Sequence, residues 1–255
     1  MRQKIDINKL IDISIEAGNA IMNIYNDESQ FNIVDYKTDD SPLTLADKIS
    51  HEVITDRLIT LYPDIPILSE EGSNISYNIR NGWPVFWLVD PLDGTKEFIK
   101  RNGEFTVNIA LIEKNHPTLG IIYVPDKKWL YYGEKGLGAW KTDENSIHYE
   151  LKVQKKISNN TAVRSRSHGS PEEEELYIKH KVSKFISVGS SLKFCMVAEG
   201  KADIYYRHGP TMEWDTAAGQ AIVEAAGGKV MKGQGLERFS YNKESLLNDS
   251  FLVSS

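Results

Sequence analysis

The sequence predicts a layered α/β or α+β fold, because strand-like runs and separate helical segments are mixed along the whole chain. Residues 85–89 form an apolar run, and residues 105–111 alternate with a period of two, which is typical of a strand. The 255 residues are enough for one large domain or two tightly joined lobes.

Two helices are expected near the start of the chain. Asp6 can cap the first helix, which carries a rough apolar stripe through residues 7–25. The second helix is expected to start near Thr44 and Asp47 and to be stopped by Pro63.

Strands dominate the middle of the chain. Short strands at residues 65–68 and 85–89 each lead into acidic residues. Further strands are expected at residues 105–111, 119–124 and 129–132, the last two joined by a turn at 125–128. This order indicates an antiparallel sheet of consecutive strands.

A polar, lysine-rich stretch at residues 141–160 has the weakest pattern, and we place a lobe junction there. The N-terminal lobe then spans residues 1–145 and the C-terminal lobe residues 146–255. In the second lobe, Pro171 opens a helix with a solvated, glutamate-rich first turn, and Asp215 starts an alanine-rich helix. Strands of this lobe are expected at residues 161–165 and 185–188.

Charge and cysteine content exclude several classes of protein. The net charge of −6 argues against a nucleic-acid partner, because that needs a basic face. The single Cys195 excludes an internal disulfide, and we expect a buried, inert thiol. Without a secretory signal or a bilayer-long apolar run, the protein is expected to be cytoplasmic. Oligomeric state and peripheral attachment to the inner face of the cell membrane stay open.

Three acidic clusters are the candidates for chemistry: residues 70–71, 90–95 and 214–215. The middle cluster, Asp-Pro-Leu-Asp-Gly-Thr, crowds hard oxygen ligands at a strand end, as magnesium requires. Asp90 could bridge two cations while Asp93 completes one shell. The carbonyl of Leu92, freed by the turn from regular pairing, could be a further oxygen ligand.

Gly94 and Thr95 suit the handling of a phosphate. Gly94 removes side-chain bulk so that a phosphate can approach the backbone, and Thr95 can orient a nucleophilic water. The helix expected after them would attract phosphate to its N-terminus. The alternative is structural, namely a type I turn at residues 90–95 and helix caps at Asp47 and Asp215. The preceding strand and the joint presence of three clusters favour a metal site.

The same clusters resemble a known family. Residues 70–71, 90–95 and 214–219 look like the inositol monophosphatase-like, lithium-sensitive phosphatases. A narrower likeness, to the bacterial 3'(2'),5'-bisphosphate nucleotidases of the CysQ type, is carried by residues 90–112, 165–168 and 189–200. The likeness covers nearly the full chain and implies an αβαβα sandwich, the inositol-phosphatase/fructose-bisphosphatase-like fold.

The resemblance implies a specific activity. Members remove the 3'-phosphate of adenosine 3',5'-bisphosphate (PAP) with metal-activated water, giving AMP and phosphate, and so support sulfate assimilation. Many also act on 3'-phosphoadenylyl sulfate (PAPS). Magnesium is required, about two or three ions per active site, and lithium or calcium inhibits. The implied partner is a small nucleotide substrate.

The resemblance also implies roles for residues at matching positions. Thr95 with Glu70 would activate the attacking water, and Asp47 would support Thr95. The implied metal ligands are Glu70, Asp90, the Leu92 carbonyl, Asp93 and Asp215. The residues implied to contact substrate are Glu70, Leu92, Asp93, Gly94, Thr95, Ser165, His168, Ser190, Ser191, Lys193 and Asp215. For His168 the alternative to substrate contact is a surface histidine, and for Lys193 it is a solvated charge.

Three rival functions remain. An inositol monophosphatase or related sugar phosphatase would keep the chemistry and change the substrate. An aspartyl-phosphate enzyme is suggested by Asp93-Gly94-Thr95, which echoes haloacid dehalogenase-like phosphatases, but there the two aspartates are two apart, whereas Asp90 and Asp93 are three apart across Pro91. A metal-dependent nucleotide-binding regulator without turnover is the third, and the intact set of ligand positions argues against it.

Overall fold

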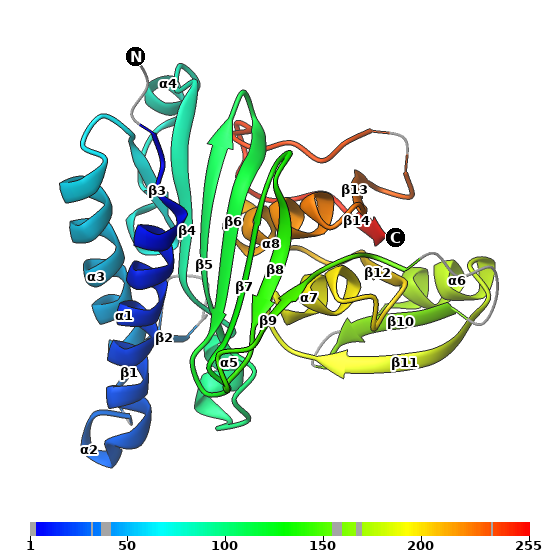
Figure 1. Ribbon diagram of the computed structural model, residues 1–255, viewed down its shortest axis with the longest axis horizontal. Helices are drawn as coiled ribbons and strands as arrows, with labels where there is room; N and C mark the ends of the chain where they lie inside the picture. Colours follow the sequence, from blue (N-terminus) through cyan, green and yellow to red (C-terminus); the bar gives the residue numbers. More distant parts are fainter. Residues whose placement is uncertain (1–3, 32, 37–41, 155–159, 167–169, 236) are drawn as a thin grey trace.

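The computed structural model describes residues 4–31, 33–36, 42–154, 160–166, 170–235 and 237–255. Five layers follow one another (Figure 1): helices α1 (Ile7–Asn26) and α3 (Leu45–Leu61), a seven-stranded sheet, helices α7 (Leu192–Ala198) and α8 (Glu213–Ala225), a five-stranded sheet, and helix α6 (Pro171–Lys179). The predicted αβαβα sandwich is confirmed. None of the helices in the described part of the chain has the length and apolar character that a bilayer span demands.

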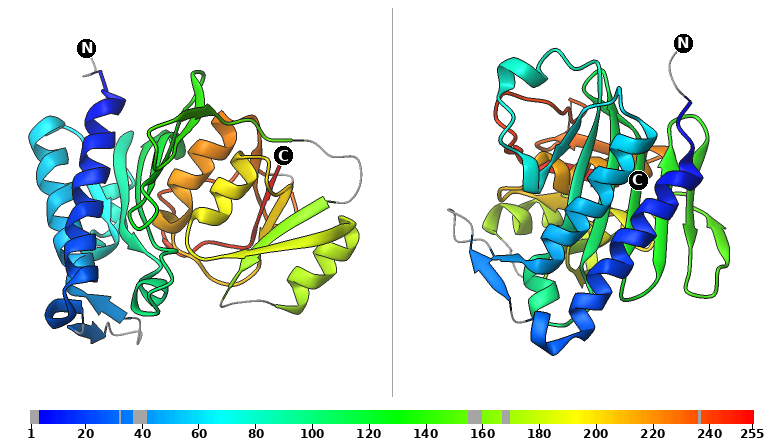
Figure 2. Two further views of the ribbon diagram at one scale, coloured as in Figure 1. Left: turned by 60° about the horizontal axis from the view of Figure 1, so that its bottom comes forward. Right: turned by 90° about the vertical axis from the view of Figure 1, so that its left-hand side faces the viewer.

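The outer helices α1 and α3 lie side by side on one face of the seven-stranded sheet (Figure 2). α1 begins directly after Asp6, as predicted, and the Asp6 carboxylate accepts a hydrogen bond of 3.0 Å from the N–H of Asn8. α3 ends ahead of Pro63, also as predicted. Buried residues of both helices, such as Ile13 and Leu58, form one core with the sheet.

The seven-stranded sheet is a meander with one parallel strand at its edge. Its strands, in spatial order, are β3 (Ile67–Ser69), β4 (Val85–Asp93), β5 (Thr106–Glu113), β6 (His116–Val124), β7 (Trp129–Glu134), β8 (Gly138–Thr142) and β9 (His148–Glu150). β3 runs parallel to β4, and each later neighbour is antiparallel, which confirms the predicted consecutive strands. A bulge between Asp90 and Asp93 interrupts the pairing of β4 with β5 at the acidic motif.

Short elements complete this half of the molecule. They are α2 (Glu28–Phe31), β1 (Val34–Tyr36), β2 (Pro42–Thr44), the 3₁₀ helix η1 (Glu70–Gly72), α4 (Tyr77–Arg80) and α5 (Thr95–Ile99). η1 and α5 are important for the site, because they follow directly on β3 and β4. η1 carries the first acidic cluster, and α5 begins at Thr95, the last residue of the second cluster.

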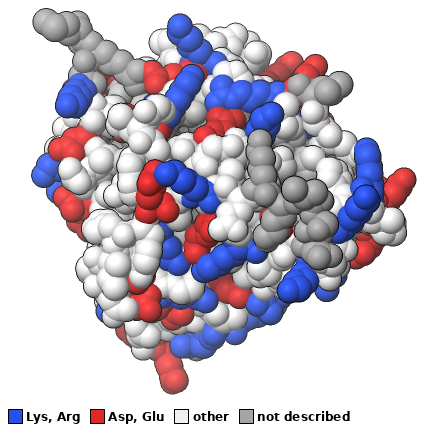
Figure 3. All heavy atoms as spheres, turned by 45° about the vertical axis from the view of Figure 1, so that its right-hand side comes forward, with Lys and Arg blue, Asp and Glu red and all other residues white. Residues whose placement is uncertain are grey.

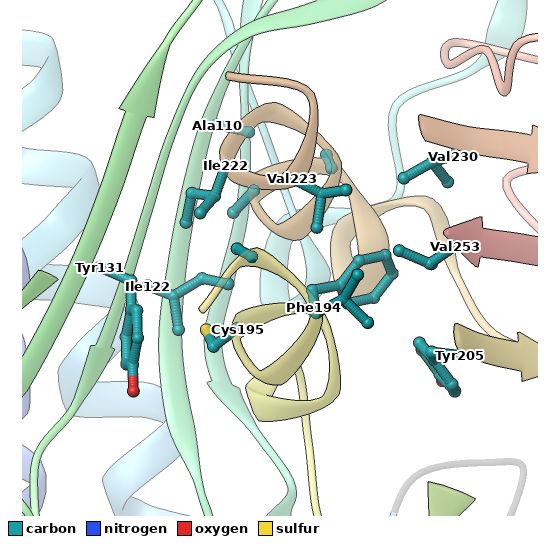
Figure 4. Packing of buried hydrophobic residues seen from close by; sticks show 14 of the residues in the cluster. Ala110, Ile122, Tyr131, Phe194, Cys195, Tyr205, Ile222, Val223, Val230 and Val253 are labelled. Atoms are coloured by element: carbon teal, nitrogen blue, oxygen red, sulfur yellow. The ribbon is translucent and has the colours of Figure 1, made fainter. Parts of the chain in front are cut away.

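Helices α7 and α8 fill the space between the two sheets, where Phe194, Cys195 and Ile222 pack into a shared core (Figure 4). α8 lies so close to β6 that a Cβ on Gly120 would stand 2.4 Å from the carbonyl oxygen of Ala218. The sheet therefore needs glycine at this position. Cys195 is fully buried, and burial raises the pKa of its thiol, which confirms the prediction of a buried cysteine.

The five-stranded sheet is mixed. Its strands, in spatial order, are β11 (Val182–Val188), β10 (Asn160–Ser165), β12 (Ile204–Arg207), β14 (Phe251–Ser254) and β13 (Lys229–Lys232). β10 and β11 correspond to the two strands expected here. α6 begins at Pro171, as predicted, and covers the outer face of the sheet through Leu176 and Tyr177. β9 still belongs to the first sheet, and the division into lobes at 145/146 stays a prediction.

Charged side chains of both signs are interspersed on the face of the molecule in Figure 3. A nucleic-acid-binding surface gathers Lys and Arg on one face, as a continuous basic patch or stripe. The absence of a nucleic-acid partner stays an expectation drawn from the net charge.

Candidate active site

The central acidic motif lies at the bulge that ends β4. Asp90 is buried, and its Oδ1 accepts a hydrogen bond of 3.1 Å from the N–H of Leu92. Ser50 of α3 donates to the carbonyl of Pro91 at 2.7 Å. The motif is therefore held by its own aspartate and by the outer helix layer, and residues 90–93 belong to the bulged end of β4.

Gly94 makes the motif compact. Its φ of +92° lies in the left-handed region, and a Cβ there would stand 2.1 Å from the hydroxyl oxygen of Ser190. Both facts require glycine. The glycine brings Thr95 to the start of α5, where its hydroxyl donates to Oδ1 of Asp47 at 3.2 Å and lies 3.5 Å from the carbonyl of Leu92.

Asp47 combines two roles that the sequence left as alternatives. Its Oδ2 accepts hydrogen bonds from the N–H and the hydroxyl of Thr44, at 2.7 and 2.5 Å, and so caps α3 from the third position of the helix. Its Oδ1 accepts from Thr95. Burial raises the pKa of Asp47 to about 6, although the bonds from Thr44 oppose the rise. One carboxylate therefore serves as a helix cap and as the support of Thr95.

Asp93 is held by the turn that precedes α7. Its Oδ2 accepts from the N–H of Ser191 at 2.6 Å and from the side-chain amide of Asn108 at 3.4 Å. The hydroxyl of Ser190 donates to the carbonyl of Asp93 at 2.9 Å. The hydroxyl of Ser191 is buried and lies 2.8 Å from Oδ1 of Asn108. The turn thus positions Asp93, a role that the sequence did not suggest.

Asp215 is the third residue of α8. Its Oδ2 accepts a hydrogen bond of 2.8 Å from the N–H of Met212, which is the N-cap residue. Asp215 therefore caps the helix from inside its first turn, and is not itself the N-cap. Burial and the charge of Asp93 raise the pKa of Asp215 well above its usual range.

Residues from all three acidic clusters line one cavity of about 510 Å³. The implied site residues on its wall are Glu70, Asp90, Leu92, Asp93, Gly94, Thr95, Ser165, Ser190, Lys193 and Asp215. Asp47 and Ser191 support the wall from behind, and His168 lies outside the described residues. A larger hollow of about 1140 Å³, between residues 4–7 and the β5–β6 turn, contains none of the implied site residues. Its lining offers no comparable cluster of chemistry.

The carboxylates of this wall carry an excess of negative charge. Burial, and then the charges of Glu70 and Asp93, raise the pKa of Asp90 well above normal, and burial raises the pKa of Asp93 to about 6. Hard oxygen atoms with unbalanced charge fit a divalent cation. Over the described ranges, however, no three Asp, Glu, His or Cys side chains are grouped closely enough to ligate an ion. Closure around a cation therefore requires these side chains to turn from their present hydrogen bonds.

Two buried cations line the same cavity. Lys193 is 8% exposed, and its Nζ donates to the carbonyl of Ser190 at 2.5 Å. Burial lowers the pKa of Lys193, against the charge of Asp93. The alternative of a solvated charge at this position is wrong. Arg207, at the end of β12, is 9% exposed, and its buried Nε has no hydrogen-bond partner within the described part of the chain.

Sequence reasoning missed Arg207 and much of the rest of the wall. The other residues of the wall are Lys96, Glu97, Gly189, Phe194, Tyr205, Pro210, Thr211, Met212, Trp214, Thr216, Leu247 and Phe251. The sequence contains a signal for Arg207. It is the last residue of the strand Ile204–Arg207, whose other residues are Ile and Tyr, and a glycine and a proline follow shortly after it. Arginine is rarely buried, and Arg207 has only a long hydrogen bond, of 3.4 Å from Nη2 to the carbonyl of Pro210, among the bonds of the described residues, so its place on the cavity wall suggests a ligand.

Comparison with known proteins agrees with this geometry. A model of the inositol monophosphatase family matches residues 5–253. The 3'(2'),5'-bisphosphate nucleotidase CysQ of Salmonella typhimurium is 47% identical to the chain, over 97% of this chain and 99% of its own length. The protein of the same name from Escherichia coli K12 is 46% identical with the same coverage.

Solved structures give the same result. CysQ from Bacteroides thetaiotaomicron, described as a bacterial member of the inositol monophosphatase family, has a TM-score of 0.83 and 44% identity, and 97% of each chain is covered. SuhB from Bartonella henselae has a TM-score of 0.79 and 25% identity, over 97% of this chain and 93% of its own. The chain therefore belongs to the inositol monophosphatase family, whose members are generally metal-dependent phosphatases.

Proposed function

We propose that this enzyme hydrolyses the 3'-phosphate of PAP to give AMP and phosphate. Relatives named as 3'(2'),5'-bisphosphate nucleotidases align with 97% of the chain, which supports this substrate class. PAPS carries the same 3'-phosphate ester, and we include it as a second substrate. The corresponding role is the removal of PAP during sulfate assimilation in the cytoplasm.

The observation that carries the proposal is the pairing of an acidic cluster with two buried cations in one cavity. A bisphosphate uses both. The carboxylates hold cations for the phosphate that is cleaved, and Lys193 and Arg207 neutralise the phosphate that stays. Inositol 1-phosphate would leave the second group of charges without a ligand. The position of Lys193 and Arg207 on the same wall as the carboxylates therefore favours a nucleoside bisphosphate over an inositol phosphate.

Magnesium is the proposed cofactor, with about two or three ions per site. The residues that would hold it are Glu70, Asp90, the Leu92 carbonyl, Asp93 and Asp215. Bound magnesium supplies a water of lowered pKa and neutralises phosphate charge. The Thr95 hydroxyl donates to Asp47, so its oxygen lone pairs are left to accept a hydrogen bond from the attacking water and to orient it.

The remaining groups complete the mechanism. We assign Glu70 to receive the proton of the water, and the backbone of Gly94 and Thr95 to contact the phosphate. Ser165, His168 and Ser190 are proposed contacts of the nucleoside or its 5'-phosphate. The water attacks phosphorus directly while the bond from phosphorus to the 3'-oxygen breaks. That oxygen takes up a proton and leaves as the 3'-hydroxyl of AMP, and no phosphoenzyme forms. A trapped phosphoaspartate would instead support the aspartyl-phosphate alternative.

Phosphate release from PAP, PAPS and inositol 1-phosphate, measured in magnesium with and without millimolar lithium, tests the proposal. We expect the fastest release from the nucleotides and inhibition by lithium. Faster release from inositol 1-phosphate would favour the alternative, an inositol or sugar phosphatase. Tight binding of PAP without any release would indicate a nucleotide-binding regulator.

A further inference from the structure

An irregular segment, residues 242–248, reaches the active-site cavity at Leu247, and we call this segment the lip. Leu247 is on the wall of the cavity, although its side chain is 49% exposed. The segment pairs with the residues just before α8: Leu247 bridges Met212, and the N–H of Asn248 donates to the carbonyl of Thr211 at 2.8 Å. Pro210, Thr211 and Met212 also line the cavity, so its wall beside Leu247 is largely apolar above an acidic floor.

The buried carboxylate of Glu213 fixes this lip from below. Glu213 is fully buried, and it accepts hydrogen bonds from the N–H of Asn242 at 2.6 Å, the N–H of Lys243 at 2.9 Å and the Lys243 Nζ at 2.6 Å. Lys243 Nζ also lies 3.1 Å from Oδ1 of Asn248. A buried charge is tolerated only when it is paired and hydrogen-bonded in this way, and removal of one partner is strongly unfavourable.

A second buried charge fixes the other side of the segment. Arg80 of α4 donates from Nη1 to Oδ1 of Asn242 at 2.8 Å and to the carbonyl of Lys243 at 2.7 Å, and from Nη2 to the carbonyl of Glu244 at 2.8 Å. Asn242 returns a bond to the carbonyl of Arg80 at 2.7 Å and has a φ of +65°, which asparagine tolerates better than most residues. The lip therefore has one defined position despite its lack of regular structure.

We propose that Leu247 is a surface on which the nucleoside of the substrate packs, and that Glu213 is the positioning residue that sets its place. The proposal rests on the proposed function, because only a nucleotide substrate presents an apolar base beside its phosphates. The first turn of α8 holds Asp215 through Met212 and the lip through Glu213. Asp215, at the proposed phosphate site, and Glu213, which holds the lip, lie in the same turn of α8. This turn therefore fixes the distance between the phosphate site and the lip.

Kinetics with two matched substrates test this role. PAP is compared with its abasic analogue, 1-deoxyribose 3,5-bisphosphate, which keeps both phosphates and lacks the base. For wild type, Leu247→Ala, Glu213→Gln and Lys243→Met, the measured quantity is the ratio of KM for PAP to KM for the analogue. We expect each variant to raise this ratio about tenfold, since an apolar contact of leucine size with the base is lost or displaced.

Arg238→Met is the matched control. Arg238 pairs with Glu224, which lies on α8 like Glu213, and Arg238 is absent from the active-site wall. Its loss should therefore leave the KM ratio near the wild-type value. Lys243→Arg, which keeps the charge, should also restore the wild-type ratio. Thermal unfolding of every variant monitors folding, and Leu247→Ala, at a half-exposed position, keeps the test valid if the Glu213 variant does not fold.

A wild-type ratio in Leu247→Ala, or the same increase in Arg238→Met, would overturn the proposal. A wild-type enzyme that cleaves inositol 1-phosphate and neither bisphosphate would refute the proposed function first, and this role with it. The two failures are distinguishable because the second is seen without any variant.

Discussion

The hydroxyl of Thr95 donates to Oδ1 of Asp47 at 3.2 Å, while Oδ2 of the same carboxylate caps α3 through Thr44. The side chain proposed to orient the attacking water is therefore fixed by a helix of the outer layer. The stability of α3 and the alignment of Thr95 depend on one buried carboxylate, much as outer-shell partners orient metal ligands.

Thr95→Val should lower kcat for PAP by about 100-fold or more, because it removes the hydroxyl that orients the water. Thr95→Ser keeps the hydroxyl and should lose less than about tenfold. Steady-state kinetics at saturating magnesium measure both values. Equal kcat values for the valine and serine variants would exclude the hydroxyl from the mechanism.

Asp90→Asn should reduce turnover and at the same time stabilise the metal-free protein. Burial and neighbouring carboxylates raise the pKa of Asp90 well above normal, so its charge is unfavourable in the folded state without a cation. In EDTA at pH 7 the Tm of the variant should therefore rise, whereas kcat in magnesium should fall about 1000-fold, equivalent to about 4 kcal/mol of barrier. Near-normal turnover at saturating magnesium would remove Asp90 from the mechanism.

The metal-free protein should gain stability from Asp93 as the pH falls. Burial raises the pKa of Asp93 to about 6 in the folded protein, against an ordinary value of 3.8. Between these values the folded state binds more protons than the unfolded state, so protonation favours folding, and the gain is complete below about pH 4. Conversely, the unfavourable effect of the charged carboxylate is fully present above about pH 6.

Comparison with Asp93→Asn isolates this effect from that of other titrating groups. In EDTA, the Tm of Asp93→Asn minus that of wild type should be small at pH 4 and should grow as the pH rises to 7. Magnesium should reverse the order at pH 7, because only the wild type gains a ligand for the ion. A Tm difference in EDTA that does not change between pH 4 and 7 would show that Asp93 titrates normally.

Arg207→Met should weaken binding of PAP selectively. We expect KM for PAP to rise about tenfold to 100-fold, since charge-assisted hydrogen bonds to the second phosphate are lost, while KM for 3'-AMP changes less than about twofold. Arg164→Met is the control, because Arg164 stacks on Phe185 and is not on the cavity wall. An equal rise of KM for PAP and for 3'-AMP would contradict the assignment of Arg207 to the second phosphate.

Local signals explain which parts of the fold were predictable. The starts of α1 and α6 follow from Asp6 and Pro171, since capping and the proline ring act within one turn. The three acidic clusters were recognisable for a similar reason, because a strand end or a helix start is visible beside each of them.

Features that depend on distant packing could not be predicted. Lys193 is buried because α7 packs against β12, and Arg207 on that strand is buried in the same way. Glu213 looks like an ordinary acid in the first turn of a helix until the fold brings Lys243 to it. The exact cap position of Asp215 likewise depends on which N–H its carboxylate reaches.

Anomalous diffraction from a crystal soaked in manganese tests most directly whether carboxylates from separate segments bind cations together. We predict a peak inside the cavity, with Glu70, Asp90, Asp93 and Asp215 turned toward it as ligands. No peak among these four residues, with their side chains still in the hydrogen bonds of the metal-free protein, would contradict a shared metal site.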